Sequence, residues 1–214
     1  MRPFVLALAV LCLIAGLAPA ATPSEARADG DLAELTAEEK RILAQGELVA
    51  RPKTESRGRL RLIGGTSFLL LDTPPDVVWR AMNDTDRFHK MLPQAKSTQV
   101  LSREATFGRI RIRHEQGPAR VEYVLDLRYL EKTRVLMFQL NERFPSGLEA
   151  GWGFIRLTPQ RGDKTLVSFG AMVDLGNRLG PHIVKKRIHE WLLKVPLTMK
   201  WYLEGGGAQL YTEG

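Results

Sequence analysis

The sequence predicts an α+β fold in which a curved antiparallel sheet of seven strands is closed by a long C-terminal helix. Three observations predict it. Six segments with strand-like alternation follow one another between residues 97 and 175. An unbroken amphipathic helical pattern then covers residues 177–204. One apolar strand and two short helices are predicted before the six strands, so the order is strand, two helices, six strands, long helix.

The last helix has its apolar residues on one side. At about 100° per residue, one sector collects Val184, Ile188, Trp191, Val195, Met199 and Tyr202. The apolar side of such a long helix must be buried, and the concave face of the sheet is the surface available to bury it. A sheet closed in this way encloses a pocket, which favours an apolar ligand. Pro196 is expected to kink the helix near residues 192–195, as a gate or as a static bend.

The predicted strands have one apolar and one charged face. In residues 107–114 isoleucines alternate with arginines, and residues 120–130 alternate in the same way. The turn at Gln116-Gly117-Pro118 makes these two segments an antiparallel hairpin, in which the arginines face Glu122 and Asp126. The arginine row is therefore interpreted as a solvated sheet face. The other strands are expected at residues 60–71, 97–103, 135–141, 149–158 and 165–175.

A short polar helix is predicted before the first strand, at residues 31–45. Thr36 and Glu39 have the spacing of a capping box, and Gly46 is the stop. This helix is expected to lie outside the main domain. The charged run at residues 51–59 is expected to link it to the first strand.

The N-terminal segment has the pattern of a secretory signal. Met1-Arg2 is followed by an apolar run, residues 4–17, and then by small residues. Cleavage is expected near Ala20, or alternatively near Ala28, and an uncleaved membrane anchor is the other interpretation. The expected location is periplasmic or extracellular. The single cysteine, Cys12, lies within this segment, so the mature chain has no thiol or disulfide.

Composition predicts one domain with a moderate basic excess. The sequence has 31 basic and 24 acidic residues, a net charge of +7. Without Arg2 this becomes 30 against 24, or about +6. Export argues against nucleic acid as the partner. The basic excess then indicates contact with an anionic membrane surface, or it serves solubility alone. The expected division is a signal peptide at 1–20, an N-terminal helix and linker at 21–58, the main domain at 59–204 and a flexible tail at 205–214.

Residues 70–93 carry a family resemblance. Residues 70–84 read Leu-Leu-Asp-Thr-Pro-Pro-Asp-Val-Val-Trp-Arg-Ala-Met-Asn-Asp, and residues 87–93 read Arg-Phe-His-Lys-Met-Leu-Pro. Thr73 can cap a helix from Pro74 to about Asn83, and Pro93 ends a second short helix. The pattern resembles the START-related superfamily, which includes polyketide cyclase/dehydrase-like proteins, ubiquinone-binding START proteins and plant carriers of the birch-pollen-allergen type.

The resemblance extends over about residues 60–204. It implies a helix-grip fold, in which a seven-stranded antiparallel sheet wraps the C-terminal helix around a hydrophobic cavity. One departure is Asp76, where the family often has Glu, and a second is Pro196 inside the last helix.

The candidate ligand-binding residues are large apolar side chains expected to face the cavity. Those on strands are placed by alternation, those on the last helix by its apolar side, and those before Pro93 by the pocket entrance that the resemblance implies. They are Phe88, Met91, Leu92, Tyr123, Leu125, Phe138, Leu140, Trp152, Phe154, Ile188, Trp191, Val195 and Met199. For each of them, ordinary core packing is the alternative.

Signs of catalysis are sparse. His182 and His189 lie on one helix roughly 10 Å apart, too far to share a metal ion, and no metal or cofactor is predicted. The sequence lacks the common hydrolase, zinc and phosphate-loop motifs. Polar residues that could act as acid or base inside a cavity are His89, His114, Tyr123 and Asp174.

Two functions of different classes follow. The first is exported, non-catalytic binding or transfer of a hydrophobic small molecule such as a lipid, quinone or polyisoprenoid. The alternative is a polyketide cyclase or dehydratase that uses polar residues of the pocket. A transient membrane contact is also expected, because Ile183, Leu193, Leu197 and Trp201 form a second apolar line bordered by lysines. The protein is expected to be a monomer.

Overall fold

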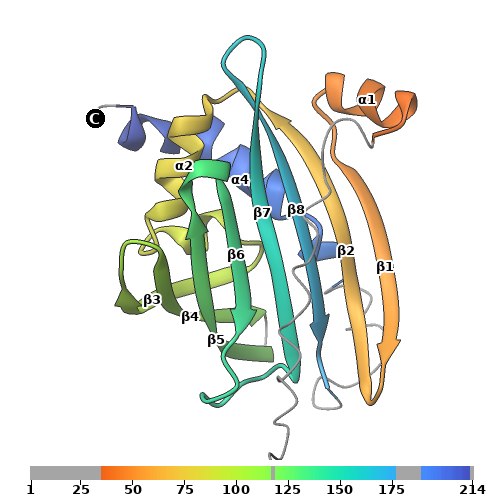
Figure 1. Ribbon diagram of the computed structural model, residues 1–214, viewed down its shortest axis with the longest axis vertical. Helices are drawn as coiled ribbons and strands as arrows, with labels where there is room; N and C mark the ends of the chain where they lie inside the picture. The colour runs from red at the N-terminus through yellow and green to blue at the C-terminus, as the bar shows by residue number, and fades with distance from the viewer. Residues whose placement is uncertain (1–34, 117–118, 177–188, 213–214) are drawn as a thin grey trace, which may run out of the picture.

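The protein forms one open antiparallel sheet with helices packed against it. The computed structural model describes residues 35–116, 119–176 and 189–212. The sheet has eight strands in the order β1-β2-β8-β7-β6-β5-β4-β3, so β1 and β3 are its free edges. Figure 1 shows its long, curved strands, with α2 and α4 on one side. The predicted α+β class and helix-grip arrangement are confirmed, with one strand more than expected.

The strands are β1 Val49–Arg57, β2 Leu60–Leu71, β3 Ala95–Arg103, β4 Phe107–Gln116, β5 Ala119–Leu130, β6 Val135–Leu140, β7 Ala150–Gln160 and β8 Lys164–Asp174. The helices are α1 Ala37–Ala44, α2 Pro75–Asn83 and α4 Val195–Glu204, together with the 3₁₀ turns η2 Phe88–Met91, η3 Glu131–Thr133 and η4 Gly207–Tyr211.

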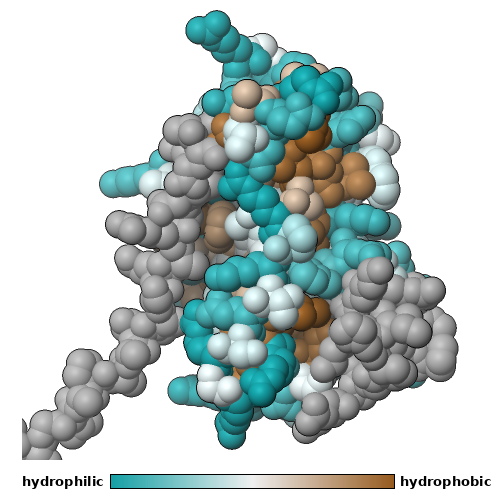
Figure 2. Space-filling model, turned by 90° about the vertical axis from the view of Figure 1, so that its right-hand side faces the viewer, coloured by the Kyte–Doolittle hydropathy of each residue, from teal (hydrophilic) through white to brown (hydrophobic). Residues whose placement is uncertain are grey.

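The additional strand is β1. Residues 51–59 were expected to be a link, but Val49–Arg57 pairs along its whole length with β2. The sequence of β1 lacks an apolar alternation, because only Val49 is buried. An edge strand needs pairing on one side only, and it tolerates a proline such as Pro52. Figure 2 looks onto this edge and shows hydrophilic side chains along much of it, with hydrophobic ones visible between them.

The concave face of the sheet carries the main core. Directly opposed residues of neighbouring strands share a face, and the register places the apolar sets of six strands on one side. Its buried members are Leu69, Leu71, Ile110, Ile112, Leu125, Leu127, Tyr129, Leu136, Leu140, Ile155, Leu157, Val167, Phe169 and Ala171. Residues from α2, η2 and α4 complete this cluster from above.

The convex face carries the arginine row, as predicted. Arg109 Nε lies 2.6 Å from Asp126 Oδ1, and Arg111 Nε lies 3.3 Å from Glu122 Oε1 across the β4–β5 pair. These are partly exposed ion pairs, which contribute little to stability individually. They show that this side of the hairpin is a paired, solvated surface.

Helix α1 packs on the convex face and does not lie outside the main domain. Its capping box is confirmed, since Glu39 N donates to Thr36 Oγ1 at 3.2 Å and Thr36 N donates to Glu39 Oε2 at 2.8 Å. Arg51 of β1 also binds Glu39, with two bonds of 2.7 Å. A second apolar cluster lies beneath the helix and consists of Leu35, Leu43, Val49, Phe68 and Leu166.

The two helices after β2 differ in detail from the expectation. Pro74, not Thr73, is the N-cap of α2, and it has no side-chain cap bond. Thr73 is buried instead, and its carbonyl oxygen accepts a bond of 2.6 Å from Thr165 Oγ1. The second helix is only the 3₁₀ turn η2.

The expected kink in the last helix is a break. Residues 189–192 are helical, residues 193 and 194 form a turn, and α4 starts at Val195. Pro196 stands in the first turn of α4, where its missing N–H removes no intrahelical bond. The break changes the helix faces, so Leu193 of the expected outer line is buried while Trp201 stays exposed. Val184 and Ile188 lie outside the described residues.

Candidate ligand-binding site

The candidate site is the concave face of the sheet together with α2, η2 and α4, which we call the trough. Its middle is aromatic. The rings of Phe138 and Phe169 stack with centroids 6.1 Å apart. The Phe138 ring lies over Gly153 of β7, where an added Cβ would come within 2.4 Å of its Cζ atom. Glycine at this position therefore lets the ring lie directly on the backbone.

Most of the sequence-predicted residues do meet in the trough. Buried within its cluster are Phe88, Met91, Leu125, Leu140, Val195 and Met199, and partly buried against it are Leu92, Tyr123 and Phe138. Trp191 is partly buried near one end of the described residues. Ile188 lies outside them. The structure thus gathers these side chains around one apolar surface, and their contact with a ligand stays a prediction.

Trp152 and Phe154 were expected to point inward, and this placement is wrong. Trp152 is opposite Met172 and Phe154 is opposite Gly170, so both lie on the convex face. In β7 the residues that face the trough are Ile155 and the other odd-numbered residues of the strand. The Phe154 ring instead covers Gly170, where an added Cβ would be 2.4 Å from its Cε1 atom.

One polar pair lies on the trough face near the end of β4. His114 Nε2 is 2.9 Å from the Tyr123 hydroxyl, and the two rings stack at 5.6 Å with planes 16° apart. Burial lowers the pKa of His114, against the opposing effect of hydrogen bonds to the backbone of Pro93 and Gln94. Burial raises the pKa of Tyr123. Both groups are therefore neutral near pH 7.

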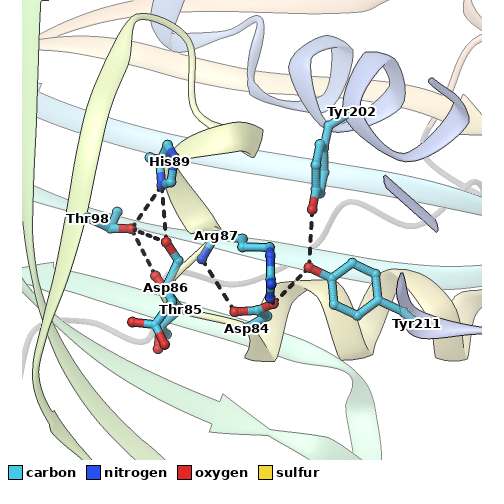
Figure 3. A network of polar contacts seen from close by, with 8 residues as sticks. All are labelled: Asp84, Thr85, Asp86, Arg87, His89, Thr98, Tyr202 and Tyr211. Atoms are coloured by element: carbon cyan, nitrogen blue, oxygen red, sulfur yellow. Dashed lines mark hydrogen bonds and ion pairs between the residues drawn. The ribbon is translucent and has the colours of Figure 1, made fainter. Parts of the chain in front are cut away.

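The other two acid or base candidates have structural roles. Asp174 is on the convex face, and its carboxylate accepts bonds from the backbone N–H groups of Arg61 at 2.7 Å and Gly176 at 2.8 Å. His89 Nδ1 lies 3.1 Å from the Asp86 carbonyl oxygen and 3.3 Å from Thr98 Oγ1 (Figure 3). Of the four candidates, only His114 and Tyr123 come together.

Two buried hydroxyls have no hydrogen-bond partner in the part of the chain that the structure describes. They belong to Ser67 and Tyr129, which sequence analysis did not single out. Both lie on the trough face, in one row that runs across the strands. Phe169 of β8 is next to Ser67 in this row, and residues of β7 and β6 separate Phe169 from Tyr129. Burial raises the pKa of Tyr129 to about 12, and Arg103 lies over its ring at 3.8 Å. The only sign of their position in the sequence is that each lies two residues from a buried leucine, and therefore on the same strand face as that leucine.

A hollow of about 890 Å³ lies at the end of the sheet where β6 stops. Leu140, a trough residue, lines it together with Leu148 of the β6–β7 loop. Its remaining lining is mixed in charge and includes Arg59, Arg120, Glu122, Glu142 and Glu149. The hollow therefore touches the trough cluster only at Leu140 and Leu148, and Arg120 and Glu122 in its lining are on the convex face. No sequence pattern predicted it, because it arises where two strands diverge.

The C-terminal residues fasten α4 to the α2–η2 junction. The expectation of a flexible tail at residues 205–214 is wrong for η4, whose Tyr211 is buried. The Tyr211 hydroxyl donates to Asp84 Oδ2 at 2.9 Å and lies 3.3 Å from the Tyr202 hydroxyl, and Arg87 binds the same carboxylate at 2.7 Å (Figure 3). We call Asp84, Arg87, Tyr202 and Tyr211 the C-terminal clasp.

The described residues carry no arrangement for a metal ion. Within residues 35–116, 119–176 and 189–212, His, Cys, Asp and Glu form no group of three or more that could hold one. In the same ranges, no helix has the length and apolar character needed to span a bilayer.

Residues 71–191 match the family described as polyketide cyclase / dehydrase and lipid transport. The chain belongs to this family. The matched region begins at the last residue of β2, so α1 and β1 precede it. The family supports two kinds of function, which are the binding of a hydrophobic small molecule and cyclase-like chemistry. No curated protein sequence matches the chain significantly.

Several solved structures share the fold. A protein from Thermus thermophilus is 17% identical with a TM-score of 0.57, over 70% of this chain and 98% of its own. Zhui aromatase/cyclase from a Streptomyces species is 11% identical with a TM-score of 0.58, over 69% and 94%. A STAR-related lipid transfer protein from Xanthomonas axonopodis is 11% identical with a TM-score of 0.56, over 72% and 98%. At these identities the likeness concerns the fold alone.

Proposed function

We propose that this protein binds a hydrophobic small molecule, such as a lipid, quinone or polyisoprenoid, in the trough and transfers it without chemical change. The observation that carries the proposal is the aromatic and aliphatic concave face, a continuous apolar surface against which α2, η2 and α4 pack. Sites for small molecules are lined mainly by apolar and aromatic side chains, as this face is. Burial of the ligand's apolar surface would supply its affinity, at about 25 cal/mol per Å².

The test is native mass spectrometry of the protein purified from its own host, followed by organic extraction. We expect one apolar molecule per chain. Gly151→Leu should lower the amount bound, because Gly151 faces the trough near Leu140 and Leu148 at ordinary contact distances. Arg156→Leu is the matched control, since Arg156 is on the convex face of the same strand. An empty protein that also fails to take up apolar probes would contradict the proposal.

A cyclase or dehydratase remains the second candidate, and the His114–Tyr123 pair favours it. The two groups touch each other on the trough face and are partly buried, as an acid–base pair in a pocket would be. Turnover assays on aromatic polyketide-like substrates with the wild type and His114→Leu would test it. If the wild type forms product and His114→Leu binds the substrate but forms none, the protein is an enzyme. That result would overturn the proposal of a non-catalytic carrier.

Export and membrane contact complete the proposal. The N-terminal residues 1–20 have the composition of a secretory signal, which supports a periplasmic or extracellular carrier. Trp201 and Leu210 are 66% and 59% exposed, and they are the large apolar side chains available for lipid contact in the described chain. Fractionation of the host with an antibody to the protein tests the location. Recovery in the cytoplasm at full precursor mass would contradict export.

A further inference from the structure

A second hollow, of about 420 Å³, lies between the start of α2 and the turn that joins β5 to β6. We call it the α2 hollow, and Figure 1 shows this turn beside α2. Its apolar lining consists of Trp79, Leu157 and Pro159, and its charged lining includes Asp76 and Arg134. It shares no lining residue with the larger hollow where β6 ends. Its volume lies within the usual range for a small-molecule site.

Arg134 occupies a backbone position that suits glycine or asparagine better. Its φ angle is 49°, in the left-handed region, which most residues with a side chain avoid. The tight β5–β6 connection fixes this conformation, since Arg134 N donates to Glu131 O at 3.0 Å and Arg134 O accepts from Leu157 N at 3.1 Å. Glycine would adopt it without a steric cost. The turn therefore does not explain the arginine, and the role of its side chain has to.

The Arg134 side chain already binds a carboxylate, but holds it loosely. Its Nη2 donates to Asp76 Oδ1, the only side-chain bond of this guanidinium within the described residues, although arginine has five N–H donors. Arg134 is 29% exposed and Asp76 is 67% exposed, so water competes strongly for the aspartate. Glu131 and Lys132 also line the hollow, and because both are exposed and opposite in sign, Arg134 decides which charge it selects.

The apolar lining is a fixed surface next to this guanidinium. Leu157 is 3% exposed and belongs to the main core cluster, against which Trp79 packs. Trp79 also meets the Tyr129 ring edge to face, with centroids 6.3 Å apart. An apolar group in the hollow would therefore rest on side chains that the core already holds in place, and ordering them would cost little on binding.

We propose that the α2 hollow binds a small organic carboxylate, whose charged group replaces Asp76 at Arg134 while its apolar body lies against Trp79, Leu157 and Pro159. A planar guanidinium suits a carboxylate because two parallel N–H bonds can form between them. The site does not depend on the proposed carrier function, because its ligand lies in the hollow and does not enter the trough.

Isothermal titration calorimetry with three probes tests the ligand class. The probes are 1-naphthoate, 1-naphthamide, which has the same body without the charge, and acetate, which has the charge without the body. We expect 1-naphthoate to bind about tenfold more tightly than either of the others, the strength of one charged hydrogen bond. Its affinity should fall as salt is added, because part of it is electrostatic.

Substitutions of the two ion-pair partners should act in opposite directions. Arg134→Asn keeps a residue that tolerates the left-handed backbone, so the affinity for 1-naphthoate should fall to that for the amide while the urea midpoint stays equal or rises. Asp76→Asn removes the competing carboxylate, and the affinity should rise about threefold, the strength of a partly exposed ion pair. Arg143→Asn, at an exposed arginine beyond the other end of β6, is the matched control and should leave the affinity unchanged.

The outcomes decide the proposal without the carrier function. If 1-naphthoate does not bind, binds no better than its amide, or binds Arg134→Asn as well as the wild type, the site is overturned. A lower affinity in Asp76→Asn would also overturn it, because Asp76 would then support the probe and not compete with it. If Gly151→Leu abolishes the binding of 1-naphthoate and Arg134→Asn keeps it, the probe lies in the trough and this inference fails while the carrier stands.

Discussion

Tyr129 carries a buried hydroxyl without a partner in the described chain, and its removal should stabilise the fold. Tyr129→Phe keeps the ring beneath Arg103 and against Trp79, and removes only the unpaired oxygen. We expect a gain of about 1 kcal/mol in the free energy of unfolding, measured by urea denaturation. Tyr123→Phe should show the opposite sign, because it leaves His114 Nε2 unpaired. A loss of stability in Tyr129→Phe would mean that the hydroxyl has a partner, such as a bound water.

Gly153 tests the packing of the aromatic middle of the trough. In Gly153→Ala the new methyl group would meet the Phe138 ring at 2.4 Å and the Gly170 carbonyl oxygen at 2.2 Å. Because one of these atoms belongs to the backbone, we expect a loss of about 2 kcal/mol, measured by thermal unfolding. Gly151→Ala, on the same strand and face, meets nothing closer than 3.6 Å and should be nearly neutral. Equal effects in both variants would contradict the argument.

At the scale of elements, the C-terminal clasp links α4, η4 and α2 through one carboxylate. Burial alone would raise the pKa of Asp84, but the hydrogen bonds from Arg87 and Tyr211 outweigh it and lower this pKa. A lowered pKa in the folded state stabilises the fold above the pKa of the unfolded carboxyl, about 3.9. This stabilisation is lost as the pH falls through the folded value.

Asp84→Asn should therefore lower stability at pH 7 and flatten its decline in acid. The measurement is the urea midpoint from neutral pH down to about pH 3, where the ordinary carboxyl pKa has been passed. Tyr211→Phe should have a smaller effect of the same kind, because it removes one of the clasp's bonds. Asp163→Asn, in the exposed β7–β8 turn, is the control. An Asp84→Asn profile parallel to that of the wild type would refute the role of the clasp in acid sensitivity.

Elements with regular alternation could be predicted from the sequence, and others could not. β4 and β5 were placed almost to the residue, because apolar and charged residues alternate along them. β1 gives no such pattern, since its single buried residue is Val49. The face of β7 was misjudged at Trp152 and Phe154, because apolar side chains occur on both parities of that strand.

The candidate site was predictable in its apolar part and less so in its polar part. The strand alternation and η2 supplied most of the trough, and His114 and Tyr123 were recognised by parity. The clasp was missed because the bond from Tyr211 to Asp84 spans 127 residues, and the glycines before η4 suggest a flexible end. Ser67 and Tyr129 look ordinary in sequence, since the absence of a partner becomes visible only after folding.

At the scale of the whole molecule, the proposed membrane contact would depend on two exposed side chains. Trp201 is on α4 and Leu210 on η4, the two elements that the clasp holds together. We expect the double variant Trp201→Ser and Leu210→Ser to float less with anionic vesicles than the wild type does. Trp152→Ser is the control, since Trp152 is a partly exposed tryptophan on the convex face. Flotation that is unchanged in the double variant would exclude this surface.

The strand that precedes the family match covers a sheet edge that would otherwise favour self-association. β2 is a long, mostly apolar strand, and β1 occupies its outer row of backbone N–H and C=O groups. A chain trimmed to start at residue 59 would present that row to any other strand, and unprotected apolar edges template aggregation. We expect such a truncation to form oligomers or fibres in light scattering while the full chain stays dispersed. β1, which lies outside the family match, would then be the segment that prevents strands of other molecules from pairing with β2.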